Sequence, residues 1–269
     1  MIRPLPGIAA VTLALLSPAA SAEIDYNYLL DEQGMHNVLI HVEQKNCKAA
    51  VSELNKGIAN KQRAVLLLAG SMYEQGICLK QDWDQAAHYY QLADQAGHRA
   101  AMSRLISGYA EKNRDPAAAL WWMAKSHYQV SKTCSSANAL VDDPDAFVAA
   151  LNTWPSGQLA ACVYMAGVYT RIMGDVESPG DTKGVNGDAI MTFVPSTGSI
   201  TWKRGATDRV NVTRALEGAD SETSIFNEKI LKHVRAVSAR ALAQFSRPDG
   251  IAPDLVITDT LHYRTFLME

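Results

Sequence analysis

Residues 63–98 contain two apolar stripes with helical spacing, separated by a polar stretch at 74–84. The first stripe consists of Leu66, Leu67, Ala69, Gly70 and Tyr73, and the second of Ala86, Ala87, Tyr90, Ala93 and Ala96. Recurrence at three and four residues predicts two amphipathic helices. Small residues on both stripes allow the helices to pack closely, and Gly97 supplies a left-handed residue that ends the second helix.

A second copy of this pattern follows directly, at residues 99–125. Tyr109 in this copy corresponds to Tyr73 in the first. Asp115-Pro116 predicts the start of the second helix of the copy. The alignment matches Ala117, Ala118, Trp121 and Ala124 with Ala86, Ala87, Tyr90 and Ala93. Residues 48–60 look like the second helix of an earlier copy, and 160–169 like the first helix of a later one. One hairpin cannot cover its own apolar stripes, so a stack of neighbouring copies is expected.

The alanine, glycine and tyrosine pattern, followed by D-x-x-x-A-A-x-x-Y-x-x-A-x-x-x-G-H, resembles the Sel1-like repeat, a relative of the tetratricopeptide repeat. Residues 63–98 carry the most specific part of the resemblance. It implies a helical solenoid over residues 23–173. Between 125 and 159 the pattern fades, and Asp143-Pro144 and a turn at 155–157 predict two less regular helices that cap the solenoid.

Residues 174–188 are rich in glycine and acidic residues and predict a linker. Beyond residue 188, apolar and polar residues alternate. This alternation predicts a β-hairpin with strands at 189–194 and 199–204, joined by a turn at 195–198. Residues 221–245 predict a helix and 255–264 a last strand. The fold class is therefore α+β, a helical solenoid followed by a small hairpin–helix–strand domain at 189–269. This order is similar to the C-terminal domain of TonB-type energy transducers, a resemblance that implies a fold and no residue roles.

The amino terminus predicts an export signal. Arg3 precedes an apolar core at 7–16, and Ala20-Ser21-Ala22 is a small-residue cleavage site. The apolar core is too short for a membrane span, which needs about 20 residues. We expect residues 1–22 to be removed after Ala22, the mature chain to begin at Glu23, and no later segment to cross a membrane. A signal of this form in a chain that resembles Sel1-like repeats favours the bacterial periplasm over the alternative, a eukaryotic secretory route.

Composition and net charge indicate the class of protein and the kind of partner. The chain has 269 residues, 48% hydrophobic and 20% charged, which is an ordinary globular mixture. Its net charge of −3 and the absence of a basic face argue against a nucleic-acid partner.

Four cysteines, Cys47, Cys78, Cys134 and Cys162, occur without metal-ligand spacing. An even number in an oxidising compartment favours disulfides over a metal site. Three connectivities are possible. Stacking would bring Cys47 to Cys78, and Cys134 and Cys162 flank the same irregular region, so we expect neighbours to pair.

No catalytic motif, cofactor fingerprint or metal-binding motif is found, so no catalytic, cofactor or metal residue is assigned. Three side chains are candidates for partner binding: His88, Tyr89 and Trp122. Each lies one residue or more from an expected core position, which points it elsewhere on its helix. Tyr73, Tyr90 and Trp121 are expected in the core, and His98 is expected to cap or pack at a helix end.

Three functions remain open. The first is a non-catalytic periplasmic protein that binds a protein or peptide on the helical repeats; the resemblance implies adaptor or immunity roles. The second is an accessory to an envelope transport system, with the C-terminal domain docking by strand addition. The third is an enzyme with a site between the two parts. Neither the partner nor the oligomeric state follows from the sequence.

Overall fold

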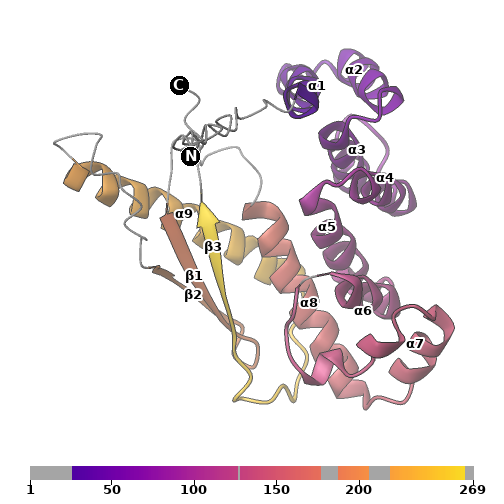
Figure 1. Cartoon of the computed structure of the whole chain (residues 1–269), viewed down its shortest axis with the longest axis vertical. Helices are drawn as coiled ribbons and strands as arrows, with labels where there is room; N and C mark the ends of the chain where they lie inside the picture. Colours follow the sequence, from indigo (N-terminus) through magenta and orange to yellow (C-terminus); the bar gives the residue numbers. More distant parts are fainter. Residues whose placement is uncertain (1–25, 127, 177–186, 206–218, 264–269) are drawn as a thin grey trace, which may run out of the picture.

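The computed structural model describes residues 26–126, 128–176, 187–205 and 219–263 (Figure 1). The expected export signal and most of the expected linker lie outside these residues. The helices are α1 (Tyr26–Glu43), α2 (Cys47–Ala59), α3 (Arg63–Gln75), α4 (Trp83–Gln95), α5 (Arg99–Ala110), α6 (Pro116–Lys125), α7 (Pro144–Leu151), α8 (Ser156–Val176) and α9 (Ala219–Gln244). The strands are β1 (Gly187–Val194), β2 (Ser199–Arg204) and β3 (Ile257–Tyr263). An α+β class is confirmed.

Side-chain caps define three helix starts, and the sequence predicted two of them, at Asp115 and Asp143. Asp82, Asp115 and Asp143 each accept a hydrogen bond from the backbone N–H three residues on, at 3.1, 2.9 and 3.0 Å. Gly97 has φ +83° just after α4, the left-handed conformation predicted for it. His98 caps α5, because its Nδ1 accepts from the backbone N–H of Ala100 at 3.3 Å.

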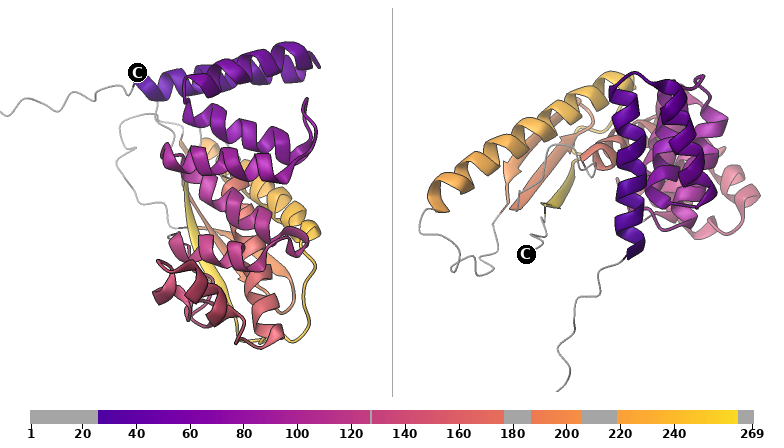
Figure 2. Two further views of the ribbon diagram at one scale, coloured as in Figure 1. Left: turned by 90° about the vertical axis from the view of Figure 1, so that its right-hand side faces the viewer. Right: turned by 90° about the horizontal axis from the view of Figure 1, so that it is seen from above.

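Consecutive helices pack on one another from α1 to α6. Helix α1 packs on α2, α3 on α4, and α5 on both α4 and α6. Figure 2 shows these helices one below another when the molecule is turned to face them. Helix α8 then packs along α5 and α6, although the irregular segment that contains α7 separates it from them in sequence.

The region between α6 and α8 differs from its prediction. Two helices were expected there, but only α7 is an α-helix of that region; the rest contains the short 3-10 helices 133–135 and 138–140. The capping pair Asp143-Pro144 identifies the start of α7 correctly. The other proline, Pro155, precedes α8 and does not begin a separate capping helix.

The three strands form one antiparallel sheet in the order β2-β1-β3. The predicted hairpin is present, with Val194 opposite Ser199 at its turn. One face of the sheet carries the buried side chains Met191, Phe193, Trp202 and Ile257. Helices α8 and α9 cover this face: Tyr164 of α8 meets Phe193 edge-on, and the indole N–H of Trp202 donates to Ser238 of α9 at 2.8 Å.

The hydrophobic core is continuous between the helices and the sheet. One cluster of buried residues contains Leu120 of α6, Phe147 of α7, Ile172 of α8, Met191 of β1 and Val237 of α9. Helix α8 is its centre, since it contacts both α5 and α9. Helix α8 reaches Val176 and β1 begins at Gly187, so both elements extend into the stretch 174–188 that was expected to be a linker.

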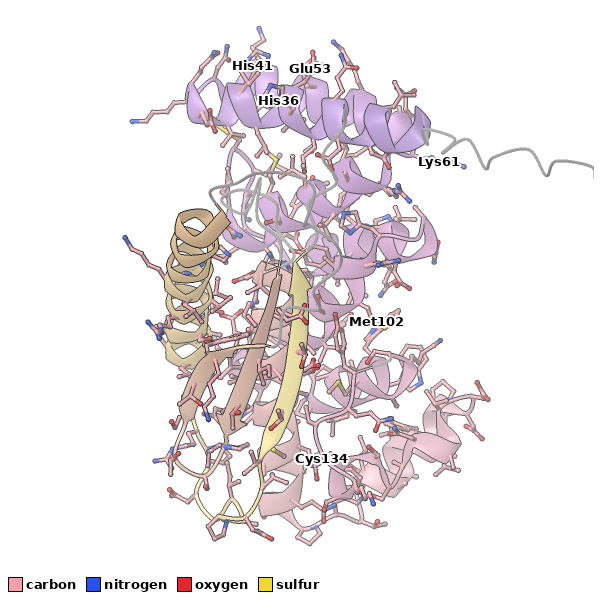
Figure 3. All side chains as sticks on the ribbon, turned by 60° about the vertical axis from the view of Figure 1, so that its left-hand side comes forward. His36, His41, Glu53, Lys61, Met102 and Cys134 are labelled. Carbon is pink, nitrogen blue, oxygen red and sulfur yellow. A yellow bond between two sulfur atoms is a disulfide. The ribbon has the colours of Figure 1, made fainter. Side chains whose placement is uncertain are left out.

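Both expected disulfides are present. Cys47, the first residue of α2, is joined to Cys78 in the α3–α4 turn, with the Cα atoms 4.9 Å apart. Cys134 is joined to Cys162 of α8, with a Cα separation of 5.5 Å. Figure 3 places Cys134 near the end of the molecule opposite α1 and α2. Each bond therefore ties a different end of the helical array.

We predict that peptide mapping without reduction recovers both pairs. Because each bond closes a loop of 31 or 28 residues, replacing both cysteines of one pair with alanine should lower the free energy of unfolding by about 3 kcal/mol. Chemical denaturation of the oxidised protein and the two double variants measures this. A peptide that joins Cys78 to Cys134 would contradict the pairing.

Candidate functional site

The side chains of His88 and Tyr89 lie on the outer part of α4, where they form an aromatic patch with Tyr73 of α3. The rings of Tyr73 and Tyr89 stack with centroids 5.6 Å apart and planes 9° apart, and His88 meets Tyr89 edge-on at 5.4 Å. His88 is exposed, while both tyrosines are half-buried. Partial burial, with the neighbouring Tyr73, raises the pKa of the Tyr89 hydroxyl above 10.0. The hydroxyl of Tyr89 therefore stays protonated at neutral pH, and its ring is in contact with those of Tyr73 and His88.

A second aromatic patch lies on α6 and consists of Trp121, Trp122 and Lys125. The two indole rings are 5.1 Å apart and nearly perpendicular. The Nζ of Lys125 lies 4.2 Å from the ring centroid of Trp121 and 5.8 Å from that of Trp122. The indole N–H of Trp121 donates to the carbonyl of Val141 at 2.9 Å. Both tryptophans are half-buried, so the prediction that Trp121 lies in the core is wrong.

The physical reason is the register of α6. When α4 and α6 are aligned on their capping residues, Asp82 and Asp115, Tyr90 aligns with Met123, and these two side chains are buried. Ala86 and Ala87 likewise align with Ala119 and Leu120, which are also buried. The sequence alignment matched Trp121 with Tyr90 and so placed the inner face of α6 wrongly.

The candidate residues of α4 and α6 occupy corresponding positions when the two helices are aligned on their caps. His88 and Tyr89 on α4 align with Trp121 and Trp122 on α6, so equivalent positions of the two helices both carry neighbouring rings. Tyr89 packs beside the apolar cluster of α2 and α3, whereas Trp122 packs beside the cluster that contains Tyr90 and Leu105. Sequence reasoning found His88, Tyr89 and Trp122 and missed Tyr73, Trp121 and Lys125.

Tyr73 was expected in the core beside Tyr90, and here the two tyrosines differ. Tyr90 is fully buried, with its ring against Gly70, where a Cβ atom would lie 2.5 Å from the ring carbons. Tyr73 is only half-buried, because its ring stacks on Tyr89 at the surface of the α3–α4 hairpin. The expectation of a buried Tyr73 is wrong, and Tyr73 belongs to the α4 patch.

A buried ion pair joins α3 to α8. An Nη atom of Arg171 lies 2.6 Å from the Oε1 of Glu74, and both side chains are at least nine-tenths buried. The hydroxyl of Tyr90 donates to the other oxygen of Glu74 at 2.5 Å. Arg171 also approaches Glu111 at 3.7 Å, and Arg104 of α5 pairs with Asp175 of α8 at 2.7 Å.

The electrostatics of this network favour its charged form. Burial by itself raises the pKa of the Glu74 carboxyl, but the positive charges of Arg171 and Arg104 and the hydrogen bonds from Arg171 and Tyr90 outweigh it, so the pKa lies below its ordinary 4.5. Burial raises the pKa of the Tyr90 hydroxyl well above 10.0, and Glu74 raises it further. Glu74, Tyr90 and Arg171 at the centre of the network are all buried, so we assign it a structural role.

Sequence analysis missed this ion pair. Glu74 was read as the start of a polar turn, and Arg171 was not considered. The signal was Arg171 itself, a charged residue within the apolar run that forms the middle of α8. A lone charge in such a run needs a buried partner.

Among the residues that the structure describes, no three His, Cys, Asp or Glu side chains are grouped in a way that could hold a metal ion. His36 and His41 lie on α1, as labelled in Figure 3. No helix in the described ranges is both long and apolar enough to pass through a membrane.

Comparison with known proteins gave no relative: no family model, no curated protein and no solved structure matches the chain.

Proposed function

We propose that this chain is an exported, non-catalytic binding protein that holds a protein or peptide partner against the aromatic patches of α4 and α6. The observation that carries the proposal is the recurrence of neighbouring rings at equivalent positions of both helices, His88 and Tyr89 on α4 and Trp121 and Trp122 on α6. A helical-repeat surface that presents the same kind of side chain from every second helix is suited to an extended or helical partner.

The geometry of the rings suits binding. Aromatic side chains, tryptophan and tyrosine above all, contribute much of the free energy at protein interfaces, because each buries a large area and loses little rotamer freedom. Here Tyr89 is held by stacking on Tyr73, and Trp121 by its hydrogen bond to Val141. Rings fixed before binding reduce the entropic cost of association.

Export to the periplasm is part of the proposal. Its support is the signal-like amino terminus and the two disulfides, a combination typical of oxidising compartments. The resemblance to Sel1-like repeats agrees with an adaptor or immunity-type role, in which the repeats form a solenoid that displays the two patches.

A second candidate function is an accessory role in envelope transport. The observation that favours it is the small sheet, in which β2 and β3 are the outer strands of the order β2-β1-β3. An outer strand offers backbone groups to which an extended segment can pair. In this alternative the partner adds to the sheet and leaves α4 and α6 free.

Photo-crosslinking distinguishes the two candidates. A benzophenone amino acid placed at exposed His88 should form a covalent adduct with the partner in cells, since the ring lies within the α4 patch. The same amino acid at exposed Thr258 of β3 is the matched control and should form none. An adduct from position 258 alone would favour strand addition and contradict the proposal.

A further inference from the structure

Helix α9 carries a row of basic side chains on the face opposite its core contacts. Its inner face packs on α8 and the sheet, with Val234 and Val237 fully buried. Lys232, Arg235 and Arg240 are exposed, and their spacing along the helix places them on the opposite side from these valines. We refer to these three side chains as the α9 stripe.

The sequence around the α9 stripe carries charge of one sign. Residues 229–248 contain five lysines and arginines and neither aspartate nor glutamate. The chain as a whole has a net charge of −3, so positive charge is concentrated in this stretch and negative charge predominates elsewhere. Such a separation produces a positive potential over one part of the surface.

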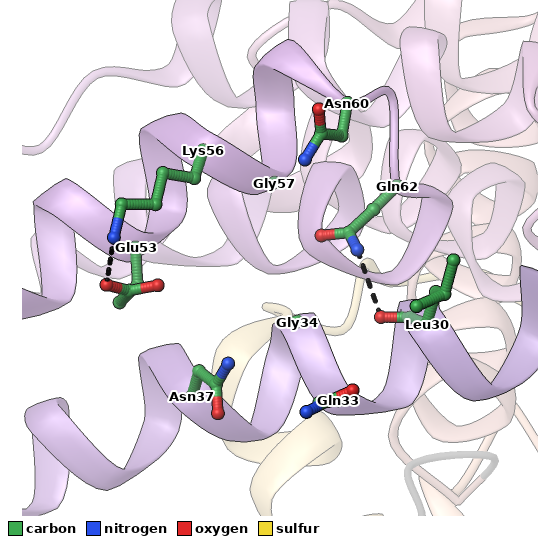
Figure 4. A pocket seen from close by; sticks show the side chains of 9 residues that line it. All are labelled: Leu30, Gln33, Gly34, Asn37, Glu53, Lys56, Gly57, Asn60 and Gln62. Carbon is green, nitrogen blue, oxygen red and sulfur yellow. Dashed lines mark hydrogen bonds and ion pairs between the residues drawn. The ribbon is translucent and has the colours of Figure 1, made fainter.

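Several other basic side chains of the protein are neutralised by a carboxylate. Figure 4 shows one such pair on α2, in which the Nζ of Lys56 lies 2.6 Å from the Oε1 of Glu53. Arg63, Arg104 and Arg114 also pair with acidic side chains. The three side chains of the α9 stripe form no ion pair with any residue that the structure describes. Their charges therefore remain available to an anionic partner.

We propose that the α9 stripe binds the surface of a membrane that contains anionic phospholipids. Lysine and arginine side chains close to such a surface are attracted by its negative potential, and this attraction needs no binding pocket. The apolar face of α9 is occupied by the protein core, so the helix lies along the lipid headgroups without entering the acyl chains.

The side chains between the charges favour lipid headgroups over a protein or a nucleic acid. Ala236, Ala239 and Ala243 are exposed there, whereas a protein interface needs large anchors such as tryptophan or tyrosine. Binding to a nucleic acid depends on many phosphate contacts, and the stripe offers three cations on a chain of net charge −3. Lipid headgroups are mobile and can gather around a convex row of charges.

Membrane binding through α9 is compatible with partner binding on α4 and α6. Figures 1 and 2 show α9 toward one side of the molecule and helices α1–α6 toward the other. Attachment by the α9 stripe therefore leaves both aromatic patches accessible. The inference does not depend on the proposed function, because no residue of the α9 stripe belongs to either patch.

The test is co-sedimentation of the mature chain, which lacks the apolar signal, with phospholipid vesicles. At about 10 mM salt, where the Debye length is about 30 Å, the protein should bind vesicles of phosphatidylglycerol and not vesicles of phosphatidylcholine. Binding should decrease as the salt is raised to about 0.15 M. The triple variant Lys232→Gln, Arg235→Gln and Arg240→Gln should bind about a hundredfold more weakly, since each charge contributes about fivefold.

The matched control removes the same number of exposed positive charges away from α9, by Lys48→Gln, Lys80→Gln and Lys132→Gln, and should bind nearly as the unmodified protein does. Absence of binding to phosphatidylglycerol vesicles, full binding by the α9 variant, or equal losses in the two variants would overturn the inference. Polyglutamate and an oligonucleotide are tested in parallel. Binding of either by the stripe, without binding to the vesicles, would assign the stripe to another polyanion and also overturn it.

Discussion

Replacing Arg171 with methionine is expected to lower the free energy of unfolding by about 3–5 kcal/mol. The change leaves the Glu74 carboxylate buried without its partner at 2.6 Å, while methionine keeps most of the side-chain volume. Removing one member of a buried ion pair costs more than the pair contributes, because the remaining charge stays desolvated. Chemical denaturation followed by circular dichroism measures the loss.

The control for this prediction is the double variant Arg171→Met with Glu74→Leu. Removing both charges leaves no buried ion, so the double variant should be more stable than Arg171→Met alone. The double variant also loses the hydrogen bond from the Tyr90 hydroxyl, because Glu74→Leu removes its acceptor. This loss lowers the stability of the double variant and has to be allowed for in the comparison. If the double variant is less stable than the unmodified protein by the full sum of the losses caused by Arg171→Met alone and by Glu74→Leu alone, Glu74 and Arg171 do not act as a pair.

The same pair gives the stability a dependence on pH. The folded-state pKa of Glu74 is lowered from 4.5. Its contribution is therefore complete above about pH 4.5 and is lost as the pH falls through the folded-state pKa. The part of acid destabilisation that depends on Glu74 should be absent from the double variant.

Tyr90→Ala is expected to destabilise the protein by about 3–5 kcal/mol. The ring is fully buried against Gly70, and its hydroxyl donates to Glu74. Tyr73→Ala is the matched control, since this ring is half-buried in the α4 patch and its loss leaves no enclosed cavity. Thermal unfolding of both variants measures the difference. Equal losses would contradict the assignment of Tyr90 to the core and Tyr73 to the surface.

The sequence predicted those elements whose signals are local. The capping residues Asp115 and Asp143 begin helices as expected, because a cap depends on the next three residues alone. The β-hairpin is likewise defined by its alternation and its short turn. The pair Cys47–Cys78 followed from the expected stacking, and the pair Cys134–Cys162 from the position of both cysteines beside the same irregular region.

Features that depend on distant contacts were not predicted. Glu74 and Arg171 are far apart in the chain, and no periodicity links α3 to α8. The orientation of α6 follows from its cap and not from the similarity of Trp121 to Tyr90. The sequence therefore predicted only Trp122 of the three side chains in the α6 patch. The segment between α6 and α7 lacks a regular apolar period, and its 3-10 turns have no reliable sequence signal.

The proposed binding surface consists of the aromatic patches of α4 and α6. The crosslink at position 88 identifies the partner, which can then be purified. Isothermal titration calorimetry of this partner with three variants of the protein is the most direct test. Tyr89→Ala and Trp122→Ala should each weaken binding by about 2 kcal/mol or more, roughly thirtyfold in the dissociation constant, while the thermal midpoint changes little. Tyr263→Ala in β3 should bind as the unmodified protein does. Normal binding by both helix variants together with loss of binding in Tyr263→Ala would contradict the account.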